Sequence, residues 1–149
     1  MAYHFYGWET AGRVKAGDDC PQYAGILTPL DLYAALSDIW CAETCAPRMR
    51  ADWTPENKTL GQCSITAFLA QDIFGGDVYG MVTKSGNIHC YNVVDGYTFD
   101  LTSEQFGDEA AELVYSGNVL QDRESAGHFG KDEKRKRYEY LKERLAART

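Results

Sequence analysis

The segment that decides the fold lies past the middle of the chain and reads IHCYNVVDGYTFDLT over residues 88–102. Its two halves are rich in aromatic and β-branched residues, which favour strands. Between them stands Asp95-Gly96, the strongest short signal for a two-residue hairpin turn. We therefore predict two antiparallel strands, over 88–94 and 97–102, joined by this turn.

The register of this hairpin brings two titratable side chains together. Pairing outward from the turn sets Val94 opposite Tyr97 and Tyr91 opposite Asp100. Because side chains alternate between the two faces, His89 and Asp100 become diagonal neighbours on one face. A slip of one residue would place them on opposite faces. We therefore expect a hydrogen bond between the His89 imidazole and the Asp100 carboxylate.

Helical patterns surround the hairpin. Thr28-Pro29 is a typical helix start and Gly75-Gly76 a typical helix stop. Helices are predicted over about 29–45, 62–74, 108–115 and 131–148, a short helix begins near Thr102, and a further strand covers 77–83. This order predicts an α+β fold, with an antiparallel β-meander packed on an N-terminal helical part and a closing C-terminal helix. No repeat or long linker divides the chain, so 1–149 is expected to form a single domain.

Composition and charge limit the expected partners. The chain has 149 residues, of which 44% are hydrophobic and 25% charged, as is ordinary for a globular protein. Its net charge of −7 argues against nucleic acid as the main partner, because phosphate binding needs a basic surface. No apolar run is long enough to span a membrane, and residues 1–8 lack the pattern of a signal peptide. We expect a cytoplasmic protein without membrane contact.

The cysteines could serve a metal or a disulfide framework. Five cysteines make an odd count, and without a secretion signal disulfides are not expected. Cys41 and Cys45 could supply two thiolates to zinc, with Cys63, His89 or Cys90 completing the set. The spacing is not that of a zinc knuckle, so we expect no metal and no cofactor. Cys90, which alternates with His89 along the strand, should point into the core.

Two features outside the hairpin have simple interpretations. His4 and His128 fall in irregular segments and are expected to be solvated. The charged C-terminal helix carries an apolar stripe of Tyr138, Leu141 and Leu145. This stripe could pack on the domain or on a second copy of the chain, so a homodimer stays open.

The most specific chemical suggestion comes from Cys63, which opens the helix over 62–74. A helix N-terminus and a neighbouring imidazolium both favour the thiolate, which is the nucleophilic form. Asp100 would orient His89 and stabilise its charge, as the carboxylate does in catalytic triads. The backbone N–H of Cys63 could bind a developing oxyanion. A side-chain donor could assist, and the candidates are Gln62, Asn57 and Trp53.

Each member of this proposed triad also has an ordinary interpretation. Cys63 alone is most simply a buried core cysteine, and His89 alone a structural histidine. Asp100 alone could cap the helix that begins near Ser103. The pattern as a whole, with its same-face geometry, favours a Cys–His–Asp site.

This pattern resembles known families. Its motifs are Gly61-Gln62-Cys63, His89-x-x-Asn92, Gly96 and Asp100-Leu101-Thr102, which look like the core of the transglutaminase-like and papain-like cysteine enzymes. A wider set over about 53–106 resembles the small bacterial YunG-like proteins, and it adds Trp53, Asn57, Asp72, Gly75-Gly76 and Gln105-Phe106. The resemblance implies Cys63 as nucleophile, His89 as base and Asp100 as the orienting carboxylate. Asn92 is expected beside the substrate.

The sequence therefore favours an enzyme that transfers an acyl group through a thioester on Cys63. Water or an amine would resolve the thioester, and the substrate would be a small amide or a peptide side chain. The alternative is a binding or structural module that keeps the same core without turnover. A pocket that opens onto the Cys63 sulfur would favour the enzyme, whereas a sulfur sealed beneath packed side chains would favour the module.

Overall fold

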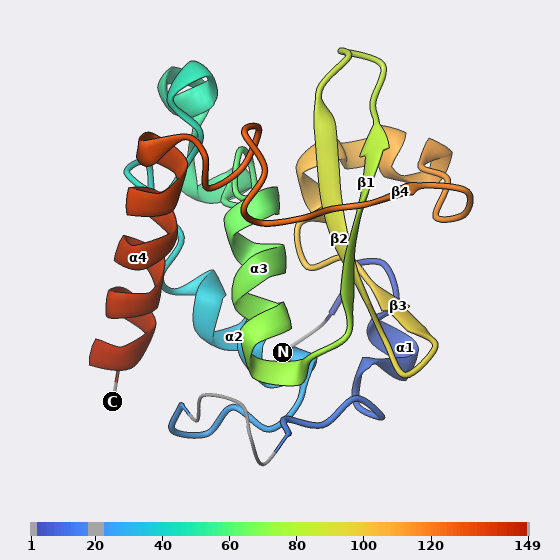
Figure 1. The fold of residues 1–149 in the computed structure, drawn as a ribbon. Helices are drawn as coiled ribbons and strands as arrows, with labels where there is room; N and C mark the ends of the chain where they lie inside the picture. Colours follow the sequence, from blue (N-terminus) through green and yellow to red (C-terminus); the bar gives the residue numbers. More distant parts are fainter. Residues whose placement is uncertain (1–2, 18–22, 149) are drawn as a thin grey trace.

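The computed structural model describes residues 3–17 and 23–148, and its sheet forms one side of the molecule (Figure 1). The sheet has four antiparallel strands in the order β3-β2-β1-β4. Their bounds are β1 Asp77–Val82, β2 Ile88–Val94, β3 Tyr97–Phe99 and β4 Val119–Leu120. Strands β1 to β3 form the predicted meander, and β4 pairs with β1 from a segment predicted as loop. Together with the helices, this arrangement confirms the α+β class.

The turn between β2 and β3 has the predicted two-residue form. Asp95 and Gly96 both adopt positive φ, 53° and 84°, as a type I′ hairpin turn requires. Val94 pairs with Tyr97 as expected, so the predicted register is confirmed at the turn. That register decides which side chains share a face further along the hairpin.

Strand β3 is shorter than predicted, because another segment takes its place as a partner. It ends at Phe99, whereas the sequence predicts a strand to Thr102. The backbone N–H of Asp100 donates to the Tyr6 carbonyl at 2.9 Å, and these two residues form an isolated antiparallel bridge. The β2–β3 ladder therefore stops before the expected pairing of Asp100 with Tyr91.

The helical segments largely follow the predicted ones. Their bounds are α1 Trp8–Ala11, α2 Pro29–Ser37, η1 Pro47–Asp52, η2 Pro55–Asn57, α3 Cys63–Phe74, η3 Ser103–Glu112 and α4 Asp132–Ala147, where η marks 3-10 helices. Helix α2 begins as predicted, and its third residue, Asp31, accepts the backbone N–H of Thr28 at 3.0 Å. The two helices predicted between Thr102 and Tyr115 are both present within η3, as 3-10 rather than α-helices, and they are separated by the non-helical backbone of Gly107.

Helix α2 ends at Ser37 rather than near Cys45. The chain turns at this point, and the Trp40 indole N–H donates to the Thr66 hydroxyl of α3 at 3.0 Å. Helical spacing in the sequence continues past Ser37, so the pattern alone predicts a longer helix than the one that forms.

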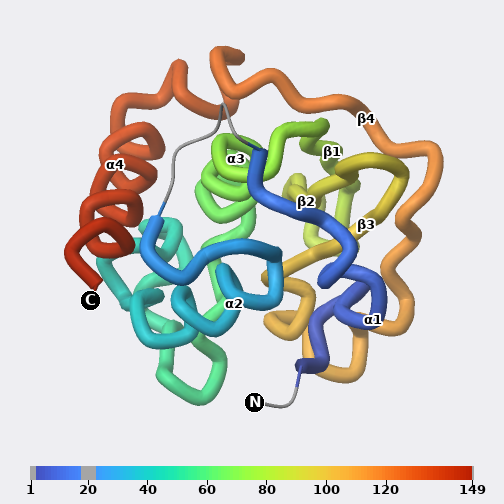
Figure 2. Tube along the Cα trace, turned by 90° about the horizontal axis from the view of Figure 1, so that it is seen from below, coloured from blue at the N-terminus to red at the C-terminus, as the bar shows by residue number. Residues whose placement is uncertain are grey.

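Helix α3 is the central element of the fold. It lies between α4 and the sheet, and the end-on view shows other segments on nearly every side of it (Figure 2). The prediction of a helix buried on most sides is confirmed by its fully buried side chains Ile65, Phe68, Leu69 and Ile73. The buried side chain of Asn92 on β2 donates to the Ala67 carbonyl at 2.9 Å, which fixes α3 against the sheet.

The apolar stripe of α4 packs on its own domain. Tyr138, Leu141 and Leu145 are buried in the main core. The Tyr138 hydroxyl also donates to the Asp72 carboxylate of α3. Of the two partners considered for this stripe, the structure selects the domain itself, so a homodimer through the stripe is not expected.

The cysteines differ in their surroundings. Cys45 and Cys90 are buried, Cys41 and Cys63 are half-buried, and Cys20 lies outside the described residues.

Within the described ranges, no helix has the length and apolar character needed to cross a membrane.

Gly61 gives the chain the turn that leads into α3 at Cys63. Its φ is +72°, and a Cβ there would lie 2.5 Å from Cys45 Sγ and 2.9 Å from Ala46 N. We predict that Gly61→Ala lowers the free energy of unfolding by about 2–5 kcal/mol, through backbone strain and overpacking. Gly117→Ala is the matched control, because Gly117 has the same φ and no neighbouring atom within 4 Å of such a Cβ. Urea unfolding measures both variants, and equal losses would refute the packing argument.

Candidate active site

Cys63 is the first residue of α3, as predicted. The N-cap residue, Gln62, makes no side-chain hydrogen bond to this end of the helix. The positive end of the helix dipole can therefore act on nearby residues. The residue is half-buried, and its sulfur lies 3.9 Å from the carbonyl oxygen of Ile88 in β2. The predicted nucleophile is therefore held against the strand that carries the predicted base.

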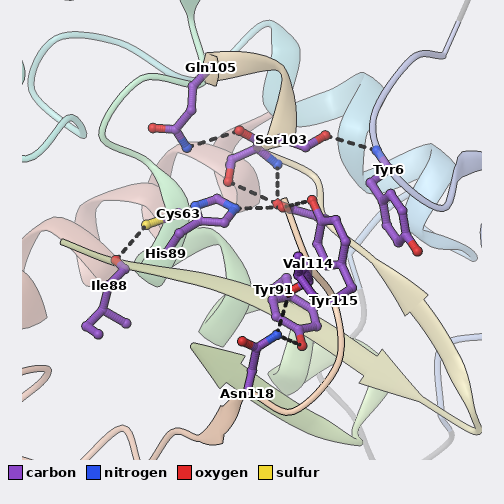
Figure 3. Close-up of polar contacts among 12 residues, drawn as sticks. Tyr6, Cys63, Ile88, His89, Tyr91, Ser103, Gln105, Val114, Tyr115 and Asn118 are labelled. Atoms are coloured by element: carbon purple, nitrogen blue, oxygen red, sulfur yellow. Dashed lines mark hydrogen bonds and ion pairs between the residues drawn. The ribbon is translucent and has the colours of Figure 1, made fainter. Parts of the chain in front are cut away.

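His89 and Asp100 meet as the hairpin register predicts. The imidazole Nε2 lies 2.6 Å from Asp100 Oδ2, and the two residues are only 2% and 0% exposed. Because a carboxylate only accepts, Nε2 carries the proton of this hydrogen bond. The other ring nitrogen, Nδ1, is buried without an oxygen or nitrogen partner among the described residues. Figure 3 shows the Cys63 sulfur and the His89 ring pointing toward one another.

Asp100 has further donors that the sequence did not reveal. Its Oδ2 accepts a hydrogen bond from the Tyr115 hydroxyl at 2.6 Å, and its Oδ1 accepts the backbone N–H of Thr102 at 3.2 Å. The Tyr115 ring stacks on Tyr6 with a centroid distance of 3.7 Å. Asp100 therefore contacts His89, as the orienting role requires, and also accepts a local hydrogen bond from the backbone. Nothing in the spacing of Tyr115 marks it as a partner, because η3 brings it back to the hairpin.

The electrostatics of the site favour a charged pair. Burial opposes the protonation of His89, but the Asp100 carboxylate and Cys63 together raise the pKa of His89 to about 10. Burial also acts to raise the pKa of the Cys63 thiol, but the contact with His89 reverses this and the pKa is lowered overall. The backbone N–H of Cys90 adds to the lowering. At neutral pH the arrangement therefore favours a Cys63 thiolate beside a His89 imidazolium.

Cys63 and His89 line a cavity of about 380 Å³ at the N-terminal end of α3. Its walls come from the segment before α3, the β1–β2 turn, η3, the segment 121–131 and α4. The ring of Phe106 packs edge-on against His89 at 4.8 Å between centroids. Gln105 also lines the cavity and accepts the Gly61 backbone N–H at 3.4 Å. Neither residue was assigned a role from the sequence, although both belong to the wider motif of the family resemblance.

The predicted assisting residues lie elsewhere. None of Trp53, Asn57, Gln62 and Asn92 lines this cavity. The Gln62 side chain is fully buried and donates to the Cys41 carbonyl at 3.1 Å. The Trp53 indole donates to the Lys58 carbonyl at 3.0 Å, and the Asn92 amide is used on α3. The side-chain donors of Trp53, Gln62 and Asn92 are used on backbone carbonyls outside the cavity, and a contact of these residues with substrate stays a prediction.

The possible metal ligands, Cys90 and His128 have the following surroundings in the structure. Among residues 3–17 and 23–148, no three His, Cys, Asp or Glu side chains gather as metal ligands would. Cys90 points into the core, as predicted. His128 was expected to be solvated, but it is only 6% exposed. Its ring packs edge-on against Phe68 of α3, a contact that depends on how the segment 121–131 folds back over the helix.

The sequence of the chain is similar to that of known proteins. A family model described as "YunG protein" matches residues 28–149, a range that contains Cys63, His89 and Asp100. A relative from Bacillus subtilis (strain 168), named "Uncharacterized protein YunG", is 35% identical over 91 residues, which cover 61% of this chain and 72% of the relative. No solved structure matches the chain. The extent of the family match shows that the chain belongs to the YunG protein family.

Proposed function

We propose that the chain is a cysteine-dependent acyl-transfer enzyme, of amidase, peptidase or transglutaminase-like type, with Cys63, His89 and Asp100 as its triad. The observation that carries the proposal is the state of the His89 ring. Its Nε2 lies 2.6 Å from a buried carboxylate oxygen, its Nδ1 has no oxygen or nitrogen partner among the described residues, and His89 and Cys63 line the same cavity. This is the arrangement that activates a thiol and then moves its proton.

The first step would form a thioester. The Cys63 thiolate attacks the carbonyl carbon of an amide, and the backbone N–H of Cys63 stabilises the resulting oxyanion. As the tetrahedral intermediate collapses, the C–N bond breaks and His89 Nδ1 donates its proton to the leaving amine. Asp100 keeps the ring oriented and stabilises the imidazolium until that proton leaves.

The second step would resolve the thioester. Neutral His89 accepts a proton from water or from an acceptor amine as that group attacks the thioester carbonyl. The C–S bond breaks, the Cys63 thiolate returns, and the product is a carboxylic acid or a new amide. Cys63 is half-buried and lines the cavity, which supports this proposal over the alternative of a sealed, non-catalytic module.

Turnover is tested with p-nitrophenyl acetate, an activated ester that acylates nucleophilic thiolates. We expect a burst of p-nitrophenolate, an acetyl group mapped to Cys63 by mass spectrometry, and continuing hydrolysis. Cys63→Ser should lose both phases at neutral pH, because a serine hydroxyl stays protonated there. Acylation without continuing turnover, either in water alone or with an added acceptor amine, would contradict the enzyme and favour the binding module.

The thiolate itself is tested by alkylation with iodoacetamide and peptide mapping. Because the pKa of Cys63 is lowered, its thiolate should persist as the pH falls below the usual thiol range of about 8–9. At pH 6.5 we predict that Cys63 reacts on the order of tenfold faster than Cys41, the other half-buried thiol. His89→Gln keeps a donor for Asp100 but no cation, and it should remove this advantage. Equal labelling of Cys63 and Cys41 at pH 6.5 would argue against an ion pair.

The charge of Asp100 is tested by two matched variants. Asp100→Asn presents an amide to the donors of His89, Tyr115 and Thr102, so it should lose stability and also slow Cys63 alkylation at pH 6.5. Tyr115→Phe removes one hydrogen bond from the same carboxylate oxygen but keeps the charge. It should lower the free energy of unfolding by about 1–3 kcal/mol with much less effect on alkylation. If both variants slowed alkylation in proportion to their loss of stability, Asp100 would have no electrostatic role.

A further inference from the structure

The cavity at Cys63 differs in charge from the protein as a whole. The chain has a net charge of −7, yet the cavity is lined by Arg48, Lys131, Lys134 and Arg137. No Asp or Glu among the described residues lines it. Cationic side chains are thus gathered at one opening of an acidic protein, where they concentrate positive potential near the sulfur.

Three of these four cations have no carboxylate partner in the described part of the chain. Arg137 is paired with Glu133 and donates to the Thr44 carbonyl at 3.0 Å, so its charge is already used. The neighbouring acid of α4, Asp132, pairs with side chains on the outer face of that helix. No ion pair within residues 3–17 and 23–148 involves Lys134, and the same holds for Arg48 and Lys131.

Lys134 is held in a defined position within the wall. Its ammonium group donates to the Gly127 carbonyl at 2.9 Å and lies 3.1 Å from His128 Nδ1. His128 Nε2 in turn lies 2.8 Å from Gln121 Oε1, which makes Nε2 the protonated nitrogen and Nδ1 the acceptor. Burial first, and Lys134 second, lower the pKa of His128 to about 4, so the ring stays neutral at pH 7.

These contacts leave one N–H donor of Lys134, which lines the cavity, without a partner among the described residues. An ammonium group has three N–H donors, and Gly127 and His128 take two of them. Lys134 is half-buried, so its remaining charge acts in a medium less polar than bulk water. A half-buried cation without a carboxylate, beside a nucleophile, is suited to hold an anionic group of a substrate.

We propose that the acyl donor of this site carries a carboxylate or phosphate group, which Lys134 binds while Arg48 and Lys131 attract it at the cavity mouth. The inference rests on the proposed function, because it concerns the substrate that Cys63 attacks. It assigns Lys134 to substrate recognition and narrows the substrate class from amides in general to anionic ones.

The test compares two alkylating reagents of similar size that differ in charge, iodoacetate and iodoacetamide. In both reactions the Cys63 thiolate displaces iodide and forms a C–S bond, so only the charge of the incoming group changes. At low ionic strength, the ratio of the iodoacetate rate to the iodoacetamide rate for Cys63 should exceed that for N-acetylcysteine by about tenfold. Lys134→Gln should reduce this ratio by a similar factor.

The matched control is Lys136→Gln, which makes the same charge change on α4. Lys136 pairs with Asp132 at 2.9 Å and does not line the cavity, so the reagent ratio should stay at the wild-type value. If Lys134→Gln and Lys136→Gln give the same ratio, Lys134 does not bind the anion and the inference is overturned. This comparison also removes the contribution of the His89 imidazolium, which is present in both variants.

Protection experiments identify the kind of anion. Succinate and inorganic phosphate are each tested for slowing the reaction of Cys63 with iodoacetamide. Protection by succinate supports a carboxylate, protection by phosphate supports a phosphate group, and protection by neither overturns the inference. A wild-type Cys63 that reacts slowly with iodoacetamide would instead refute the proposed nucleophile, and the inference with it. Fast iodoacetamide labelling without preference for iodoacetate would refute only the anionic substrate.

Discussion

The contact between the buried Asp100 carboxylate and His89 is the constraint on which the surrounding structure depends. A carboxylate with no solvent exposure must be met by donors, because an unpaired buried charge strongly destabilises a fold. Asp100 accepts from His89, Thr102 and Tyr115, and its backbone N–H donates to Tyr6. The hairpin, the N-terminal segment and the segment after η3 are therefore joined at this one residue, and His89 is the member of the group that lines the cavity.

Cys63, the proposed nucleophile, is positioned by a different set of contacts. Cys63 belongs to α3 and His89 to β2, so their meeting depends on how the helix docks on the sheet. Gly61 allows the chain to approach Cys45 closely just before the helix, and the amide of Asn92 fixes the helix to the strand. Because these contacts are buried and close-packed, small changes in them would move the sulfur relative to the imidazole. The same contacts therefore determine both the stability of the core and the geometry of the site.

Charge in this protein is separated in space. An overall charge of −7 argues against a broad basic surface, and the sequence argument against nucleic acid uses only that total. The cavity at Cys63 has the opposite sign, because the fold brings Arg48 and the start of α4 to the same opening. Lys134 keeps its charge available there because its neighbours, Gly127 and His128, are neutral acceptors. A total charge therefore describes the potential of the protein at long range, while the charge within the cavity is decided by a few side chains.

The sequence by itself determined the features that depend on neighbours along the chain. The turn at residues 95–96, the alternation that puts His89 and Asp100 on one face, and the helix opening at Cys63 all follow from local periodicity and turn chemistry. Tertiary structure alone decided that Tyr115 donates to Asp100, that the Gln62 amide is spent in the core, and that Lys134 faces the cavity. These contacts join elements that lie far apart in the sequence, and the sequence pattern does not show which of them pair. Loop closure and core packing determine which distant side chains meet.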